Sequence, residues 1–201
     1  MPNQKDYAVL LHGLWRTTRT MRRLEKALAK EGYTAINVPY PSYRAPVEEL
    51  AEKYLSTSLL KNCPDATKKI NFVTYSLGGI IVRYFLTHHP LKNVGRVVMI
   101  ATPNHGSKYA DILSKFKIAH LIFGPVLKQL KTAETSLSNT LPEPDYEYGI
   151  IAGKYDHKVP LQLALLKNTK KFIITPHAHT FITYANDVIN ATKKFLKDGN
   201  F

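Results

Sequence analysis

The sequence predicts an α/β protein built on a doubly wound, mostly parallel sheet of about six strands. Short apolar runs alternate with segments of helical periodicity along the chain, which is typical of a sheet covered by helices. The 201 residues are one domain in size, and 44% of them are hydrophobic, enough for a sizeable core. We therefore expect a single domain over residues 1–201. No apolar run reaches the ~18 residues that predict a transmembrane helix.

The apolar runs predict strands at residues 7–11, 34–38, 70–75, 94–100, 148–152 and 172–175. A helix follows the first strand, because four apolar residues share one helical face before Gly32 ends it, namely Met21, Leu24, Ala27 and Leu28. Three more helices are expected: one that begins near Pro46, one over residues 77–88 and one over 187–197.

Residues 108–144 interrupt this alternation and predict a small helical, lid-like insertion. Apolar residues fall at helical spacing on both sides of a break at Gly124-Pro125, among them Tyr109, Ile112, Phe116, Leu121 and Phe123. Over residues 108–131, five lysines accompany them against a single acid, Asp111: Lys108, Lys115, Lys117, Lys128 and Lys131. Such a segment suits a lid over an apolar pocket or a membrane-surface patch. It also suits ordinary amphipathic helices that cover the sheet.

Ser76 stands directly between a predicted strand and a predicted helix. The surrounding Thr74-Tyr75-Ser76-Leu77-Gly78 resembles the nucleophile elbow G-x-S-x-G, with threonine in place of the first glycine. In that turn a strained backbone raises the serine hydroxyl above the sheet edge. Ser76 is therefore the candidate nucleophile, although a serine-glycine turn after a strand is also common in proteins without this chemistry.

A second motif, His12-Gly13-Leu14-Trp15, follows the first strand. If the sheet order starts 2-1-3, the ends of strands one and three flank the topological switch point, where ligands bind in doubly wound sheets. The His12-Gly13 turn and Ser76 would then meet in one crevice.

Two later loops supply an acid and a base. Asp156 follows the fifth strand, where it could orient and stabilise an imidazolium, and His177 and His179 follow the sixth. We favour His179 as the base that takes the serine proton, because it leads directly into the last helical region. His157 is expected at the surface. None of the eight histidines shows a metal-ligand spacing, so neither a metal nor a cofactor is predicted.

These motifs make the chain similar to the small lipase and esterase branch of the α/β-hydrolases, including lipases like the GPI inositol-deacylases. The resemblance covers nearly the whole chain in the expected order: residues 10–15, 75–79, the loop Ala101-Thr-Pro-Asn-His-Gly-Ser107, and the loops of Asp156 and His179. About six strands can be counted, which implies a minimal α/β-hydrolase fold that lacks the first two strands of the family.

The resemblance also implies roles for further residues. The backbone N–H groups of Leu14 and Leu77 would form an oxyanion hole. The loop 101–107 would act as a scaffold or line the acyl pocket. The substrate would contact the residues His12, Trp15, Phe116, Leu121 and Phe123.

The net charge of +13 is unusual and suggests an anionic partner. No basic run interleaved with aromatic residues is present, so nucleic acid is not an expected partner, whereas peripheral contact with an anionic membrane surface is. The single cysteine, Cys63, excludes an internal disulfide, and the N-terminal apolar run is too short for a signal peptide. A cytoplasmic location is therefore expected. The sequence does not indicate an oligomeric state.

The predicted function is hydrolysis of small-molecule or lipid carboxylic esters through an acyl-enzyme. A thioesterase, amidase or acyltransferase would carry the same three residues, and a non-catalytic binding protein could retain the scaffold.

Overall fold

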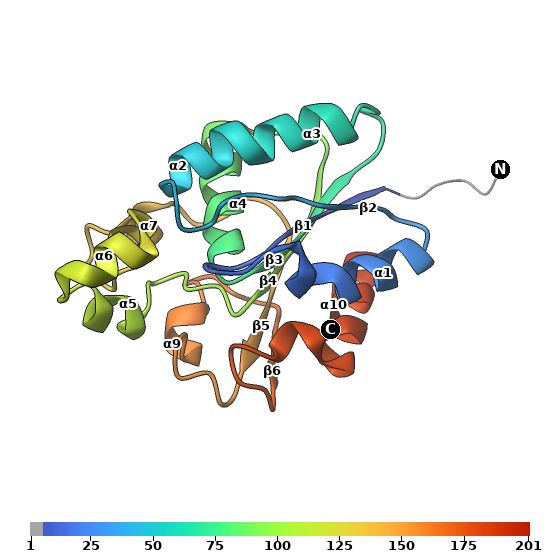
Figure 1. The fold of residues 1–201 in the computed structure, drawn as a ribbon. Helices are drawn as coiled ribbons and strands as arrows, with labels where there is room; N and C mark the ends of the chain where they lie inside the picture. Colours follow the sequence, from blue (N-terminus) through green and yellow to red (C-terminus); the bar gives the residue numbers. More distant parts are fainter. Residues whose placement is uncertain (1–5) are drawn as a thin grey trace.

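The structure of the protein, a computed structural model, describes residues 6–201 (Figure 1). Six strands form one sheet, and every pair of neighbouring strands is parallel. The strands are β1 (Tyr7–Leu11), β2 (Thr34–Asn37), β3 (Ile70–Tyr75), β4 (Val94–Ile100), β5 (Tyr148–Gly153) and β6 (Phe172–Thr175). Their order is β2-β1-β3-β4-β5-β6, which confirms the doubly wound fold and the 2-1-3 start.

Helices bury both faces of the sheet (Figure 1). On one face, Val9 and Leu11 of β1 pack with α2 (Val47–Glu49), the π-helical segment η2 (Leu50–Leu55), α3 (Ser56–Asn62) and α4 (Leu77–His88). On the other, Ala8 and Leu10 pack with α1 (Arg22–Lys30) and α10 (Asn186–Asp198). Successive strand residues point to opposite faces, so β1 is apolar throughout.

Two predicted helices differ from their expected form. The first begins as a 3₁₀ turn, η1 (Thr18–Met21), before α1, and Gly32 follows it with φ 93°, a conformation that favours glycine. The helix expected to begin near Pro46 extends to Asn62 and contains the π-helical segment η2. It extends because Leu59, one helical turn beyond Leu55, is also buried against the core.

Residues 108–144 form four short helices, and those over residues 108–129 lie at the carboxyl ends of the strands (Figure 1). These are α5 (Lys108–Leu113), α6 (Lys117–Phe123), α7 (Val126–Gln129) and α8 (Leu137–Thr140). Two further short elements lie in the segments that follow β5 and β6: α9 (Leu161–Ala164) and η3 (Ile182–Tyr184), respectively. Among residues 6–201, no helix has the length and apolar character needed to cross a membrane.

Candidate active site

Ser76 occupies the turn between β3 and α4 with a left-handed backbone, φ 51°, that few non-glycine residues adopt. Its N–H donates to the carbonyl oxygen of Ile100 in β4 at 2.9 Å. Gly78 lets α4 approach β1, since a Cβ there would lie 2.6 Å from the carbonyl oxygen of Leu11. The turn therefore has both the strain and the close packing of a nucleophile elbow.

Thr74 stands where the elbow pattern has its first glycine. The side chain is fully buried, and its hydroxyl donates to the carbonyl oxygen of Val98 in β4 at 3.1 Å. The threonine thus leaves no unsatisfied polar atom between β3 and β4. The departure from the pattern is compatible with the turn.

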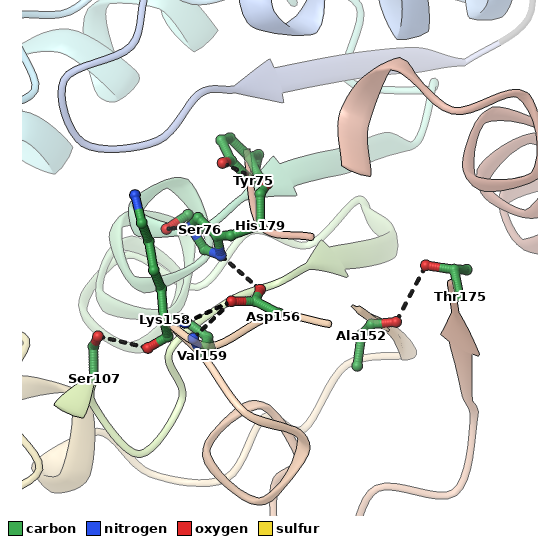
Figure 2. A network of polar contacts seen from close by, with 9 residues as sticks. All are labelled: Tyr75, Ser76, Ser107, Ala152, Asp156, Lys158, Val159, Thr175 and His179. Atoms are coloured by element: carbon green, nitrogen blue, oxygen red, sulfur yellow. Dashed lines mark hydrogen bonds and ion pairs between the residues drawn. The ribbon is translucent and has the colours of Figure 1, made fainter. Parts of the chain in front are cut away.

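A hydrogen-bond chain joins Ser76, His179 and Asp156, which follow β3, β6 and β5 (Figure 2). His179 Nε2 lies 3.1 Å from Ser76 Oγ, and His179 Nδ1 lies 2.6 Å from Asp156 Oδ2. The Asp156 side chain is fully buried and that of His179 is 11% exposed. With Nδ1 donating to the carboxylate, Nε2 of the neutral ring is the acceptor that faces the serine hydroxyl.

Further hydrogen bonds hold Asp156 and His179 in place. Asp156 Oδ1 accepts the N–H groups of Lys158 at 3.0 Å and Val159 at 2.8 Å (Figure 2). The Tyr75 hydroxyl donates to the carbonyl oxygen of His179 at 2.9 Å. Burial raises the pKa of Tyr75 to about 12, so this phenol keeps its proton at neutral pH. The carboxylate of Asp156 and the backbone of His179 are therefore both held in place.

The other histidines near the carboxyl ends of the strands lie outside this chain. His177 Nε2 pairs with Asp187 Oδ1 of α10 at 2.8 Å, and His157 is exposed. Of the two candidates that the sequence leaves open, the structure brings His179 to Ser76.

The buried side chain of His12 supports the turn after β1. This residue is 1% exposed, stacks on Tyr40 with ring centroids 4.0 Å apart, and donates from Nδ1 to the carbonyl oxygen of Gly13 at 3.0 Å. Burial lowers the pKa of His12, which favours the neutral ring. The Trp15 N–H donates to Ser42 Oγ at 3.0 Å. His12 shapes the turn but does not reach the cavity beside Ser76.

That cavity has a volume of about 300 Å³ and contains Ser76 and His179 in its wall. Of the five residues expected to contact substrate, Trp15 and Phe123 line it. Phe116 and Leu121 do not; they are 57% and 86% exposed. Sequence reasoning did not predict substrate contact for several of the residues that line it, including Arg16, Tyr109, Leu113, Leu127, Leu130 and Lys158.

The loop 101–107 both supports and borders the site. Asn104 is fully buried, and its Oδ1 accepts from the Arg83 guanidinium of α4 at 3.1 Å. Ser107 Oγ donates to the carbonyl oxygen of Lys158 at 2.7 Å, which ties this loop to that of Asp156. Pro103 and Ser107 also line the cavity. The loop therefore both ties neighbouring segments together and borders the cavity.

A larger cavity, of about 570 Å³, lies at the opposite ends of the strands, where Asp6, Lys69, Arg96 and Glu147 contribute to its wall. Ligands of doubly wound sheets bind at the carboxyl ends of strands, and this cavity is at the amino ends. Nor does it contain Ser76 or any other residue of the hydrogen-bond chain. The smaller cavity is the candidate active site.

Among the residues that the structure describes, no cluster of three or more His, Cys, Asp or Glu side chains is arranged to hold a metal ion.

The parallel sheet, its strand order and the elbow after β3 define the α/β-hydrolase fold. Residues 1–122 match the family described as "Putative serine esterase (DUF676)", and the chain belongs to this family. No curated protein sequence gives a match. Membership of this family supports a hydrolase that acts on esters.

Three solved structures similar to this chain illustrate the shared fold. The mature Bacillus licheniformis lipase BlEst2 is 20% identical with a TM-score of 0.71, over 96% of this chain and 93% of that one. Aspergillus fumigatus lipase B is 15% identical with a TM-score of 0.75, over 98% of this chain and 53% of that one. A Nitrososphaera gargenis carboxylesterase is 16% identical with a TM-score of 0.70, over 98% and 92%.

Proposed function

We propose that the protein hydrolyses carboxylic esters through an acyl-enzyme formed on Ser76. The observation that carries the proposal is the hydrogen-bond chain from the strained Ser76 through His179 to the buried carboxylate of Asp156. A serine hydroxyl is a weak nucleophile until a neighbouring base takes its proton, and this chain supplies the base and the group that orients it.

In the first half of the reaction, Ser76 Oγ attacks the ester carbonyl carbon while His179 Nε2 takes the hydroxyl proton, and the C=O π electrons move onto oxygen. The resulting oxyanion collapses, the bond to the alcohol oxygen breaks, and His179 gives its proton to that oxygen. Water then attacks the acyl-enzyme in the same way, and the acid leaves as Ser76 regains its proton. Asp156 stabilises the imidazolium in both halves.

The oxyanion is proposed to accept from the backbone N–H groups of Leu14 and Leu77. Leu77 is the first residue of α4, so its N–H has no acceptor within the helix. Neither N–H donates to a protein acceptor within residues 6–201. Two free donors beside a nucleophile are what an oxyanion hole requires, and each is typically worth roughly 10² to 10³ in kcat.

The test is hydrolysis of 4-nitrophenyl esters by the purified protein and by Ser76→Ala. We expect the variant to lose turnover while its circular dichroism and melting temperature stay close to those of the wild type. Ser58→Ala, a serine of α3 remote from the cavity, is the matched control. Equal turnover by Ser76→Ala and the wild type would remove Ser76 from the mechanism.

Thioesters, amides and transfer to an acceptor alcohol would use the same three residues. A panel of thioester, amide and ester substrates with one acyl group separates them, because a preference appears as a ratio of kcat/KM values. A non-catalytic protein would turn over none of the thioester, amide and ester substrates.

We further propose that residues 108–144 act as a lid-like insertion that contacts an anionic membrane surface. The insertion exposes apolar side chains, with Ile112, Phe116 and Leu121 more than half exposed. Exposed lysines surround them, at positions Lys108, Lys115, Lys117 and Lys128. Such an apolar patch with a basic rim suits the interface of an anionic bilayer. The cytoplasmic location expected from the sequence stays a prediction.

Vesicle sedimentation tests this contact. The protein should bind vesicles that contain anionic phospholipid more tightly than neutral ones, and Leu121→Glu should weaken that binding. Leu60→Glu is a matched control, because Leu60 is 80% exposed on α3, away from the insertion. Equal binding to both kinds of vesicle would contradict the proposal.

A further inference from the structure

Two cations line the cavity beside Ser76, and no aspartate or glutamate lines it. Arg16 follows the β1 turn, and Lys158 follows Asp156 in the β5 loop. Both are partly buried, and among residues 6–201 neither side chain forms an ion pair with a carboxylate. Partly desolvated cations without counter-ions favour the arrival of an anionic group.

The acids on neighbouring segments are committed elsewhere. The carboxylate of Asp156 is fully buried and occupied by His179 and two backbone N–H groups. Asp111 of α5 accepts from the N–H and the hydroxyl of Thr132 at 3.0 and 2.7 Å. Neither carboxylate therefore forms a direct ion pair with Arg16 or Lys158.

Both cations have defined positions. The backbone of Lys158 is fixed on two sides, by Asp156 Oδ1 and by Ser107 Oγ, and its side chain extends alongside Ser76 (Figure 2). Its Nζ lies 5.3 Å from the centroid of the Tyr109 ring, which also lines the cavity. The guanidinium of Arg16 lies near enough to the Tyr75 hydroxyl to oppose the rise in pKa that burial causes.

From this arrangement we infer that the substrate carries a phosphate or carboxylate beside its scissile ester, bound by Arg16 and Lys158. The inference rests on the proposed esterase function. A guanidinium can give an anion two parallel hydrogen bonds, and an ammonium adds a mobile point charge. Both side chains line the same 300 Å³ cavity as Ser76, so the anionic group must lie within a few bonds of the reacting carbonyl. Arg16 and Lys158 thereby determine specificity without taking part in bond breaking.

The first test compares two pairs of esters, each matched in its acyl chain. In one pair the charge is on the acyl side: 4-nitrophenyl pentanoate against the 4-nitrophenyl monoester of glutaric acid. In the other it is on the alcohol side: a monoacylglycerol against the acylglycerol phosphate. The wild type should have the higher kcat/KM for the anionic member of at least one pair. Arg16→Gln and Lys158→Gln should each lower that ratio about tenfold.

Matched controls separate the cavity from the overall basic surface. Lys154→Gln and Arg19→Gln remove the same charges at exposed positions outside the cavity, and they should leave the ratio unchanged. A wild type that prefers the neutral ester in both pairs would overturn the inference and leave the esterase proposal standing. An unchanged ratio in Arg16→Gln and Lys158→Gln would do the same.

Binding without turnover gives a second, independent readout. Trp15 is the only tryptophan of the chain and lines the cavity, so its fluorescence reports ligands there. Hexyl phosphate should bind the wild type at least tenfold more tightly than hexanol, and Lys158→Gln should reduce that difference. If hexyl phosphate binds so but no ester is hydrolysed, the esterase proposal fails and the anion site stands. Equal binding of hexyl phosphate and hexanol would overturn the anion site.

Discussion

Two regions border the cavity, and they are built differently. One consists of the loops that carry Ser76, Asp156 and His179, and the other of the helices within residues 108–144. In the loops, polar side chains are buried and hydrogen-bonded: Asp156 accepts from two backbone N–H groups, and the Tyr75 hydroxyl donates to the backbone carbonyl of His179. In α5 and α6, large apolar side chains point outward, and Leu121 is 86% exposed. The difference separates a rigid part of the site from an adaptable one.

The hydrogen-bonded loops and the exposed helices suit different functions. Chemistry at Ser76 needs distances held to within about half an ångström, which buried hydrogen bonds provide. Apolar side chains left in water stabilise no core, so α5 and α6 gain only when something outside the chain covers them. Substitutions should therefore act on turnover in the first region and on surface contacts in the second.

The largest effect is expected at the base. His179→Ala should lower kcat/KM for an ester by roughly 10⁴ to 10⁶, because nothing else takes the proton of Ser76. His177→Ala is the matched control: it removes only a partly exposed pair with Asp187 and should leave turnover nearly unchanged. The opposite result in steady-state assays would exchange the roles of the two histidines.

Asp156→Asn should lower kcat by about 10⁴ while the protein stays folded. The amide cannot stabilise an imidazolium, and it favours the wrong tautomer of His179, yet its carbonyl can still accept from the loop N–H groups. Asp187→Asn is the control at the other His–Asp pair. A pH–rate profile that matches the wild type in height would show that the buried carboxylate has no part in turnover.

The two regions should also differ in stability. Leu127→Ala should lower the free energy of unfolding by roughly 2 to 4 kcal/mol, because Leu127 is 2% exposed in the core. The same change at Leu121 should cost less than about 0.5 kcal/mol. Urea unfolding measures both, and a similar cost for the two would mean that α6 packs against the core in solution.

Thr74→Val tests the departure from the elbow pattern. It keeps the volume of the side chain but removes the hydrogen bond to Val98, at an expected cost of about 1 kcal/mol. Thr57→Val, on the exposed side of α3, should change stability by less. A Thr74→Val protein as stable as the wild type would show that only the volume of Thr74 matters.

The smallest effect concerns pH. The folded pKa of His12 lies below its ordinary value of 6.5, so below that pH the unfolded chain binds a proton that the folded chain does not. His12 therefore destabilises the fold as pH falls through 6.5. Unfolding free energies at about pH 7.5 and 5.5 should differ less in His12→Gln than in the wild type. His157→Gln, at an exposed site, should keep the wild-type difference.

Much of this molecule is predictable from its sequence. The central strands β1 and β3 are short runs buried on both faces, and in a parallel sheet with the order 2-1-3 the turns after strands one and three must converge. That convergence groups Ser76 with the turn after strand one, and the α/β-hydrolase chain order of serine, acid and histidine added Asp156 and His179. The sequence also favoured His179 over His177, and the structure places His179, whose backbone Tyr75 holds, beside Ser76.

The cavity wall was less predictable. The apolar residues of 108–123 share a helical period, but the chain breaks between α5 and α6, so Phe116 lies outside both helices and is exposed. Short helices contribute few turns, and periodicity alone does not say which face meets the core. Arg16 and Lys158 carry no motif; their only signal is their position next to Trp15 and two residues after Asp156.

The most direct test is labelling of the purified protein with a fluorophosphonate, followed by mass spectrometry of its peptides. The adduct should be found on Ser76, and it should be absent from Ser76→Ala and strongly reduced in His179→Ala. Labelling at another serine, or none with or without lipid vesicles, would contradict an acyl-enzyme on Ser76.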